Sequence, residues 1–291
     1  MSDATPLIIT DSSCDLPPEL VDRLGIEVVS LRFTIEGQDF ADDFGQSMAH
    51  TEFYGRLRGG AMPTTTAVPI TDYVAAFTRA AEAGRPALLL GLAAALSSSH
   101  EASLAAAAMV NERYPGADIR VIDTLNASAA LGYFVYQAAR RASDGLDIDT
   151  LEEWALATRS RVNGYFTVDS LEHLRRGGRI PDVVALAGSM LDLRPVIRLD
   201  PRGALVPSGQ ARGRRKSIKA LVDVAEQRAN DAGSQVAFIA HGDAPEDAQA
   251  LREQLLARVP FADVVVCELG PVIASHAGPG MLAVVFDGPE R

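Results

Sequence analysis

The chain has 291 residues, 47% of them hydrophobic, and a formal net charge of −11 at pH 7. This length and apolar content suit two α/β domains and exclude a disordered or fibrous chain. The negative charge argues against general nucleic-acid binding, because contacts to phosphate groups need clustered cations.

The chain lacks the segments that direct a protein to a membrane. No apolar run approaches the roughly 18 residues of a membrane span, and no basic segment followed by a long apolar stretch stands at the start. We therefore expect a cytoplasmic protein without a transmembrane segment, for which transient membrane contact stays open. Cys14 and Cys267 are too far apart in sequence to indicate a disulfide framework or a cysteine-based zinc site.

A strand, a polar loop and a helix open the chain. Residues 7–10 are a short apolar strand, the polar residues 11–13 follow it, and two prolines stand in the first turn of the next helix. Ligands collect at the carboxyl ends of strands in open parallel sheets, so Ser12 lies where a site would be built. Residues 26–35 then predict a second strand.

Residues 63–69, Pro-Thr-Thr-Thr-Ala-Val-Pro, place three consecutive hydroxyl side chains in a loop between two prolines. Thr71 is a good N-cap for the helix that follows, so the three threonines are not needed for capping. This pattern fits a receptor for an anion, and it equally fits a solvated turn.

A fully apolar run over residues 87–92 is typical of a parallel strand covered on both faces, and we expect it at the centre of the sheet. Ser97 to Ser99 follow it near the start of a long alanine-rich helix. Backbone N–H groups and the helix dipole favour an anion there, although serines are also common as plain caps. Residues 119–124 repeat the pattern of strand and polar loop before the helix of residues 127–141.

The alternation of strand and helix predicts an α/β fold with two lobes. The first half repeats the alternation at least four times, which indicates a mostly parallel sheet with helices on both faces. A connecting helix over residues 150–163 places the boundary near residue 160, between an N-terminal α/β lobe (1–160) and a C-terminal α/β lobe with a mixed sheet (161–291). In the second lobe we expect a helix over 181–191, a hairpin about 200–203, strands at 236–241, 264–268 and 281–286, and a helix over 245–258.

Positive charge is concentrated in one part of this acidic chain. Between Arg175 and Lys219, eleven cations stand against three aspartates, a local charge of +8 that leaves −19 elsewhere. Such a basic face indicates a docking surface for an acidic partner or a phosphate, and solvated helix faces would give the same pattern. Two glycines between Arg176 and Arg179 allow a tight turn that projects guanidinium groups outward.

Several common catalytic signatures are missing. The chain holds no P-loop, no dinucleotide-binding glycine fingerprint and no Gly-x-Ser-x-Gly elbow. The five histidines are scattered rather than spaced as metal ligands, so no metal site is predicted. His276 differs from the others because it lies in a glycine- and proline-rich turn that we expect over residues 270–280, and Gly-Pro-Gly follows it closely. It suits a donor to a bound carboxylate and equally a structural histidine.

Five segments in this order resemble the DegV family, bacterial fatty-acid-binding proteins similar to the ligand-binding subunits of fatty acid kinase. The resemblance runs over essentially the whole chain. The segments are Ile-Thr-Asp-Ser-Ser-Cys-Asp-Leu-Pro at 9–17, Pro-Thr-Thr-Thr at 63–66, Leu-Glu-His-Leu-Arg-Arg-Gly-Gly-Arg-Ile at 171–180, Arg-Gly-Arg-Arg-Lys at 212–216 and His-Ala-Gly-Pro-Gly at 276–280.

The resemblance implies a protein that holds one long-chain fatty acid between its lobes, with the chain in an apolar tunnel. A partner, the catalytic subunit of fatty acid kinase, would phosphorylate the carboxylate to an acyl phosphate that feeds phospholipid synthesis. The protein would then be a binding subunit rather than an enzyme, with no cofactor or metal besides the lipid ligand. The implied carboxylate site consists of Thr65, Thr66, Ser97 and His276, with Ser12 and Ser98 as secondary candidates.

The basic segment would then be the surface that docks the kinase, with Arg175, Arg176, Arg179, Arg212, Arg214 and Arg215 as its residues. The chain also departs from the family pattern. Ala67 and Val68 replace the usual Gln and Pro, Ala93 and Ala94 replace a Ser-Ser pair, and Ser98-Ser99 replaces Gly-Thr. These departures leave the geometry of the carboxylate site and the choice of ligand open.

Physical chemistry agrees with a lipid ligand. Neutral hydroxyl groups can hold a carboxylate without the strong pairing that would block its attack on ATP, and burial of about 15 methylenes is worth roughly 12 kcal/mol before the costs of association. One alternative is a phosphotransferase or hydrolase for a small acyl substrate, using His276 or Ser97, but no acidic residue is predictably placed to orient the base. A sensor of a small carboxylate is another.

Overall fold

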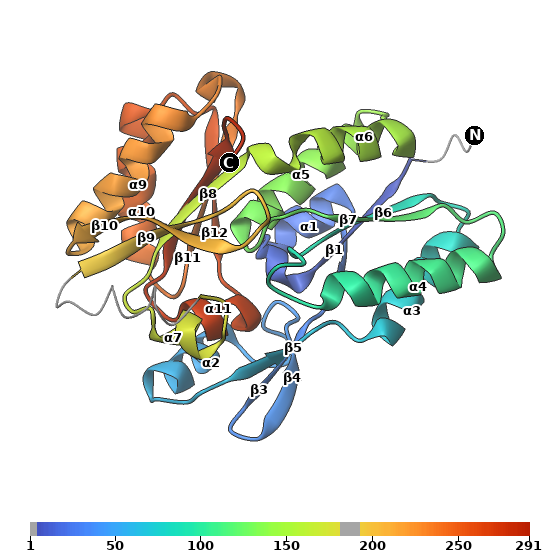
Figure 1. Ribbon diagram of the computed structural model, residues 1–291, viewed down its shortest axis with the longest axis horizontal. Helices are drawn as coiled ribbons and strands as arrows, with labels where there is room; N and C mark the ends of the chain where they lie inside the picture. The colour runs from blue at the N-terminus through green and yellow to red at the C-terminus, as the bar shows by residue number, and fades with distance from the viewer. Residues whose placement is uncertain (1–4, 181–192) are drawn as a thin grey trace.

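The computed structural model describes residues 5–180 and 193–291, and its first sheet has four parallel strands (Figure 1). The two central strands, β1 and β6, are buried along their whole length, as the apolar run at 87–92 predicts. In spatial order the strands are β2 (Glu27–Val29), β1 (Leu7–Asp11), β6 (Ala87–Gly91) and β7 (Ile119–Asp123).

Helices cover both faces of this sheet, as predicted. Figure 1 shows α5 and α6 above the strands and α3 and α4 below them. The predicted connecting helix ends earlier than expected, because the chain enters a strand at residue 162. The helices are α1 (Pro18–Leu24), α3 (Ile70–Glu82), α4 (Ser99–Arg113), α5 (Ala129–Ser143) and α6 (Ile148–Thr158).

The second sheet is mixed, as predicted, and only its β11–β12 pair is parallel. Helices α9 (Arg214–Arg228) and α10 (Pro245–Arg258) pack on one another against this sheet. The predicted helix over 181–191 lies outside the described residues. In spatial order the strands are β10 (Leu205–Arg212), β9 (Leu193–Leu199), β8 (Val162–Thr167), β13 (Leu282–Asp287), β11 (Val236–His241) and β12 (Asp263–Glu268).

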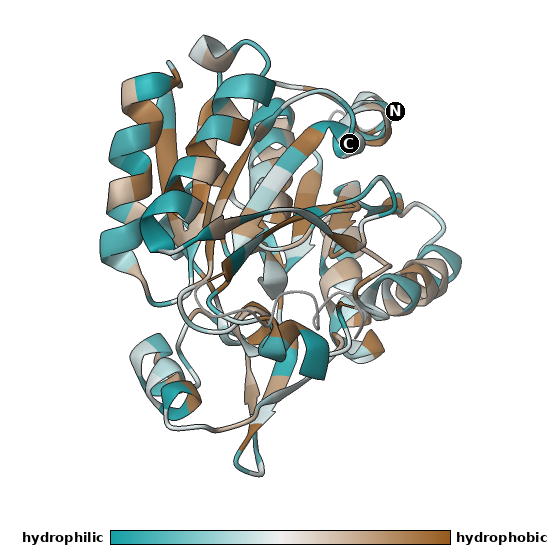
Figure 2. Cartoon of the chain, turned by 60° about the vertical axis from the view of Figure 1, so that its left-hand side comes forward, coloured by the Kyte–Doolittle hydropathy of each residue, from teal (hydrophilic) through white to brown (hydrophobic). Residues whose placement is uncertain are grey.

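Helix α5 lies between the two sheets and joins them. It contacts β1 and β6 of the first sheet and β8, β11 and β13 of the second. Eleven of its fifteen residues are buried, which is why its sequence is apolar on nearly every side. In Figure 2 the strands are mainly brown and the outer helix faces mainly teal, so the apolar surface is turned toward this shared interior.

A third, three-stranded antiparallel sheet was not predicted. Residues 26–35, expected as one strand, divide at Leu31, whose N–H group donates to Ser12 Oγ instead of a strand partner (3.0 Å). The part after Leu31 forms β3, and the threonine triplet, expected as a loop, pairs with it as an edge strand. The strands lie in the order β4 (Gln38–Ala41), β3 (Arg32–Ile35) and β5 (Thr64–Thr66). Within the described residues, no further strand pairs with β5.

Two predictions about helix ends are wrong. Thr71 lies inside α3, because the helix begins at Ile70 with Pro69 in the N-cap position. The turn expected around His276 is instead helix α11 (Pro271–Ala277), with proline at its first position, where the missing N–H is not needed. The remaining short helices are α2 (His50–Arg58), α7 (Glu172–Arg176), η1 (Ser12–Cys14), η2 (Arg159–Arg161) and η3 (Ala232–Ser234).

Helices α7 and α11 pack together through two glycine–histidine contacts. A Cβ atom at Gly177, just after α7, would overlap Nδ1 of His276 on α11. In turn, a Cβ atom at Gly278, just after α11, would lie 2.5 Å from Cδ2 of His173 on α7. Each imidazole ring therefore rests against the bare backbone of the other segment, which explains why both segments combine histidine with glycine.

The helices are short or polar compared with a bilayer span. Across residues 5–180 and 193–291, none is both long enough and apolar enough to cross a membrane.

Candidate functional site

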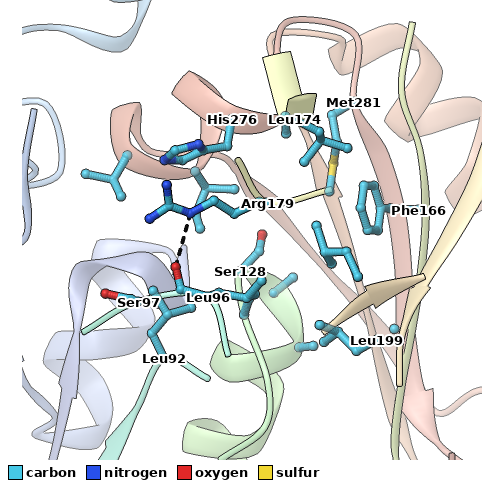
Figure 3. Close-up of a pocket in the computed structure, with 18 of the residues that line it drawn as sticks. Leu92, Leu96, Ser97, Ser128, Phe166, Leu174, Arg179, Leu199, His276 and Met281 are labelled. Carbon is cyan, nitrogen blue, oxygen red and sulfur yellow. Dashed lines mark hydrogen bonds between the residues drawn. The ribbon is translucent and has the colours of Figure 1, made fainter. Parts of the chain in front are cut away.

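A cavity of about 390 Å³ lies between the two sheets (Figure 3), within the range of roughly 300–1,000 Å³ that is typical of small-molecule sites. Its walls come from β5, the loop before α4, the start of α5, strands β8, β9 and β13, and helix α11. Most of the lining is apolar, and includes Leu92, Leu96, Ala129, Ala130, Phe166, Leu199, Leu205, Val272, Met281, Ala283 and Val285.

Polar side chains gather in one part of this lining. The structure brings together five of the six predicted carboxylate-binding residues, although their segments are widely separated in sequence. They are Thr65, Thr66, Ser97, Ser98 and His276. The cavity thus combines a largely apolar wall with one group of hydrogen-bonding side chains.

A direct contact between the lobes fixes part of this polar group. Thr65 Oγ1 and His276 Nε2 are 2.8 Å apart, although 211 residues separate them in the chain. Thr65 is placed by the pairing of β5 with β3, where it stands opposite Phe33. His276 is placed by the last turn of α11 and by its contact with Gly177.

The His276 ring is neutral at physiological pH. Burial lowers its pKa to about 4, and the charges of Arg179 and Arg176 lower it in the same direction. Its Nδ1 atom is buried and makes no hydrogen bond in the structure. A neutral imidazole can hydrogen-bond an anion without forming an ion pair.

We expect the buried His276 to make folding less favourable in acid. An unfolded histidine, with a pKa near 6.5, binds a proton as the pH falls from 6.5 to 4, while the folded one does not. Through this group alone, the free energy of unfolding should fall by up to about 3 kcal/mol over this interval. The free energies of unfolding of wild type and His276→Gln can be measured with urea. The difference between the two values should shrink or reverse as the pH falls.

The comparison between the two proteins is necessary because Asp42 has the opposite effect. Burial raises the pKa of Asp42 to about 7, so its folded form binds a proton that the unfolded form releases above pH 4. This group adds stability as the pH falls, in both proteins alike. A pH dependence that is identical in wild type and His276→Gln would contradict the prediction.

The serine loop is tied to the threonine segment. Ser97 Oγ lies 3.0 Å from Ser99 Oγ and accepts a hydrogen bond from the Ser99 N–H group (3.2 Å). Ser99 Oγ in turn accepts from the N–H group of Val68, just after β5 (3.3 Å). Ser98 occupies the N-cap position of α4 without a side-chain cap bond. The serine loop is therefore tied to the backbone that follows the threonine segment.

Arg179 lies in the cavity lining, close to His276 (Figure 3), although the sequence predicted an outward-facing docking residue. Its Nε–H group donates to the Leu96 carbonyl (3.1 Å) and its Nη1–H group to the Gly177 carbonyl (2.5 Å). Burial lowers its pKa, and no carboxylate of the described residues pairs with it. The site thus holds a half-buried cation next to its polar side chains.

The other predicted docking arginines differ in their exposure to solvent. Arg214 is only 18% exposed at its side chain and bonds to Asp247 and the Gly280 carbonyl, which makes it part of the packing of its own lobe. Arg175 pairs with the neighbouring Glu172, and Arg176 contacts His173. Arg212 and Arg215 are exposed. The proposed docking surface is therefore narrower than the sequence indicated.

Ser12 is the one candidate that the structure does not bring to this cavity. It is 4% exposed, and it lines a separate cavity of about 330 Å³ together with Asp15, Asp42 and His50. Its Oγ atom accepts a hydrogen bond from the Leu31 N–H group, at the point where the chain leaves β2. Among the residues described, no three His, Cys, Asp or Glu side chains are grouped so that they could hold a metal ion.

Sequence reasoning missed Ser128, which lines the cavity at the start of α5. Its backbone has φ 54° and ψ −142°, a conformation that residues other than glycine rarely adopt. Its hydroxyl donates to the Asp15 carboxylate (2.6 Å). Ser128 follows a parallel strand just as Ser97 does, so the same strand-end argument would have identified it.

Known proteins resemble this chain along its whole length. A family model described as "Uncharacterised protein, DegV family" matches residues 6–288. A DegV domain-containing protein of Clostridium perfringens is 38% identical over 285 residues, which cover 98% of each chain.

Solved structures give the same result. A DegV family protein from Thermus thermophilus that binds a fatty acid has a TM-score of 0.86 and 30% identity, covering 97% of this chain and 99% of its own. A stearic-acid-binding protein from Eubacterium ventriosum has a TM-score of 0.84 and 26% identity, covering 97% and 98%. The match to the family model over nearly every residue thus confirms the resemblance that the five sequence segments indicated, and the chain belongs to the DegV family.

Proposed function

We propose that this protein binds a single long-chain fatty acid, with the carboxylate at Thr65, Thr66, Ser97, Ser98 and His276 and the acyl chain along the apolar wall. The observation that carries the proposal is one cavity that unites a continuous apolar lining with a small group of hydrogen-bonding side chains. Its volume and lining suit a long apolar ligand with one polar end. The fatty-acid-binding relatives of similar fold support the same ligand class.

The proposed division of work follows from the chemistry of the lining. Burial of the acyl chain supplies most of the affinity, at about 0.8 kcal/mol per methylene before the costs of association. The hydroxyl groups and neutral His276 place the carboxylate. We place the boundary between the lobes near residue 160, so that the ligand lies between a lobe of residues 1–160 and a lobe of residues 161–291. We expect the protein to act in the cytoplasm.

The proposal predicts a loss of retained lipid in the double variant Thr65→Ala, Thr66→Ala. Hydrogen bonds to a charged group are worth about 1.5–3 kcal/mol each, so the loss of two should lower the fatty-acid affinity at least about 100-fold. Native mass spectrometry of the purified protein, followed by organic extraction, measures the retained lipid. Wild type should carry close to one fatty acid per chain.

Thr64→Ala is the matched control, because Thr64 belongs to the same strand but does not line the cavity. Its lipid content should equal that of wild type. Full retention in the double variant would return the threonine segment to a structural role. An empty wild-type protein that hydrolyses an ester or ATP unaided would favour the enzyme alternative. The structure argues against that alternative, because Ser97 contacts Ser99 rather than a histidine.

We further propose that a partner kinase, the catalytic subunit of a fatty acid kinase, phosphorylates the bound carboxylate to an acyl phosphate for phospholipid synthesis. The protein itself then needs no cofactor and performs no catalysis. Arg179 would provide positive charge beside the carboxylate that receives the phosphoryl group, and exposed cations such as Arg212 and Arg215 would attract the kinase.

Arg179→Ala is expected to retain fatty acid but to slow its kinase-dependent phosphorylation at least tenfold, because charge that develops during phosphoryl transfer loses its nearest cation. The measurement is acyl phosphate formation with a bacterial fatty acid kinase subunit and ATP. Arg23→Ala, which removes an exposed cation outside both the cavity lining and the basic segment, should change the rate less than threefold at physiological salt. Equal rates in wild type and Arg179→Ala would refute the role of Arg179.

A further inference from the structure

One buried carboxyl group joins two walls of the cavity. Asp15 is 5% exposed, and its Oδ2 atom accepts a hydrogen bond from the hydroxyl of Ser128 (2.6 Å). Its Oδ1 atom accepts from the backbone N–H group of Gly270 (2.9 Å). Ser128 and Gly270 lie 113 and 255 residues further along the chain. Asp15 therefore connects three segments that the sequence separates.

Both partners of Asp15 belong to segments that form the site. Ser128 lines the cavity, and the bond to Asp15 helps to hold its unfavourable backbone conformation. Gly270 is the N-cap residue of α11, the helix that carries His276 into the polar group. One carboxyl group thus fixes the start of α5 relative to the start of α11.

Helix α11 depends on carboxyl groups from elsewhere in the chain. No side chain of its own N-cap residue closes its first turn. The N–H groups at its start donate instead to Asp15 and, at Val272, to Asp42 (3.3 Å). The helix is only about 10 Å long, so a shift of its first turn moves His276 relative to Thr65.

Charge pairing does not explain the buried carboxyl group. Burial raises the pKa of Asp15 well above its ordinary value, and no lysine or arginine of the described residues forms an ion pair with it. A buried polar group of this kind is costly unless its hydrogen bonds are made, and an apolar residue would fill the space at less cost. Its two hydrogen bonds are what Asp15 contributes.

We propose that Asp15 is a positioning residue for the carboxylate end of the cavity, which holds α11, and thereby His276, in register with the wall that Ser128 forms. The proposal rests on the function proposed above and deepens it. Loss of this link loosens the grip on the carboxylate, while the apolar wall that holds the acyl chain stays in place.

The test compares two ligands with the same tail, palmitic acid and 1-hexadecanol, of which only the first has a carboxylate. Wild type should bind the acid more tightly than the alcohol. In Asp15→Ala the ratio of the two dissociation constants should fall at least fivefold, with hexadecanol affinity within threefold of wild type. Asp15→Asn should keep the wild-type ratio, since the amide oxygen can accept from Gly270 and the amide nitrogen can donate to Ser128 Oγ.

Each outcome decides the matter. An equal loss of both ligands in Asp15→Ala, or failure of Asp15→Asn to restore the ratio, would reduce Asp15 to a structural residue and overturn the proposal. If Asp15→Ala does not fold, Ser128→Ala carries the test, because it breaks the link to α5 and leaves the Gly270 bond; an unchanged ratio there overturns the proposal too. A wild-type protein that does not bind palmitic acid would overturn the proposed function, and with it the role of Asp15. A wild-type protein that binds palmitic acid, together with a contrary result for the variants, would overturn the role of Asp15 alone.

Discussion

Replacement of Gly177 by alanine is expected to displace the His276 ring and to cost about 1–3 kcal/mol of stability, the usual penalty of overpacking. The new Cβ atom would overlap Nδ1 of that ring and would lie 2.9 Å from its Cε1 atom and 3.2 Å from the His173 carbonyl oxygen. The backbone itself tolerates alanine, since φ is −70° and ψ is −9°. The free energy of unfolding, measured with urea, and the amount of retained lipid should therefore fall together.

A double-mutant cycle isolates this contact. In a His276→Ala background the obstructing ring is gone, so Gly177→Ala should become neutral or slightly stabilising. Gly55→Ala is the matched control: Gly55 is an exposed glycine inside helix α2, and a Cβ atom there has open space. That change should stabilise the protein by about 0.5–1 kcal/mol. Equal effects of Gly177→Ala in both backgrounds would contradict the contact.

Under the proposed function, replacement of Gly164 by valine is expected to shift the binding preference toward shorter fatty acids. Gly164 lies in β8 and lines the cavity, and a Cβ atom there would meet the Ala130 Cβ at 3.3 Å and the Val285 Cγ2 at 3.8 Å. A valine side chain would occupy the space of about two methylenes of ligand. Each is worth about 0.8 kcal/mol, so the preference between two chain lengths that differ by two carbons should shift about 15-fold.

Mass spectrometry of lipids extracted after growth on mixed fatty acids measures this shift. Gly209→Val replaces another strand glycine, in β10, where a Cβ atom meets open space outside the cavity. That control should keep the wild-type distribution of chain lengths. The same distribution in Gly164→Val would mean that the acyl chain does not reach β8.

Much of the fold follows from sequence patterns because long helices and buried strands have strong periodicity. The apolar run at 87–92 identified β6, and the hairpin about 200–203 was found from its turn residues. The failures concern short elements. β5 has only three residues and pairs along one edge with a segment 30 to 34 residues earlier, so no local pattern marks it. At α11, Pro271 was interpreted as a turn residue, although it stands at the first position of a helix.

The candidate site was predictable where hydroxyl groups follow strands and where a resemblance supplied roles. Thr65, Ser97 and His276 line one cavity, although nothing in the sequence alone brings together residues 211 positions apart. Arg179 was assigned to the surface because charge is normally solvated, and only the packing around Gly177 turns it inward. Ser12 lies instead at the second cavity, where its hydroxyl accepts from the Leu31 N–H group.

The place of β13 in the second sheet has a consequence for protein synthesis. This strand, the last of the six in the chain, lies in the middle of the sheet between β8 and β11, and it contributes Ala283 and Val285 to the cavity. A nascent chain that has left the ribosome only as far as β12 therefore exposes two unpaired strand edges and has no closed cavity. Loading of the proposed ligand must then wait until residues 282–287 have emerged and inserted into the sheet.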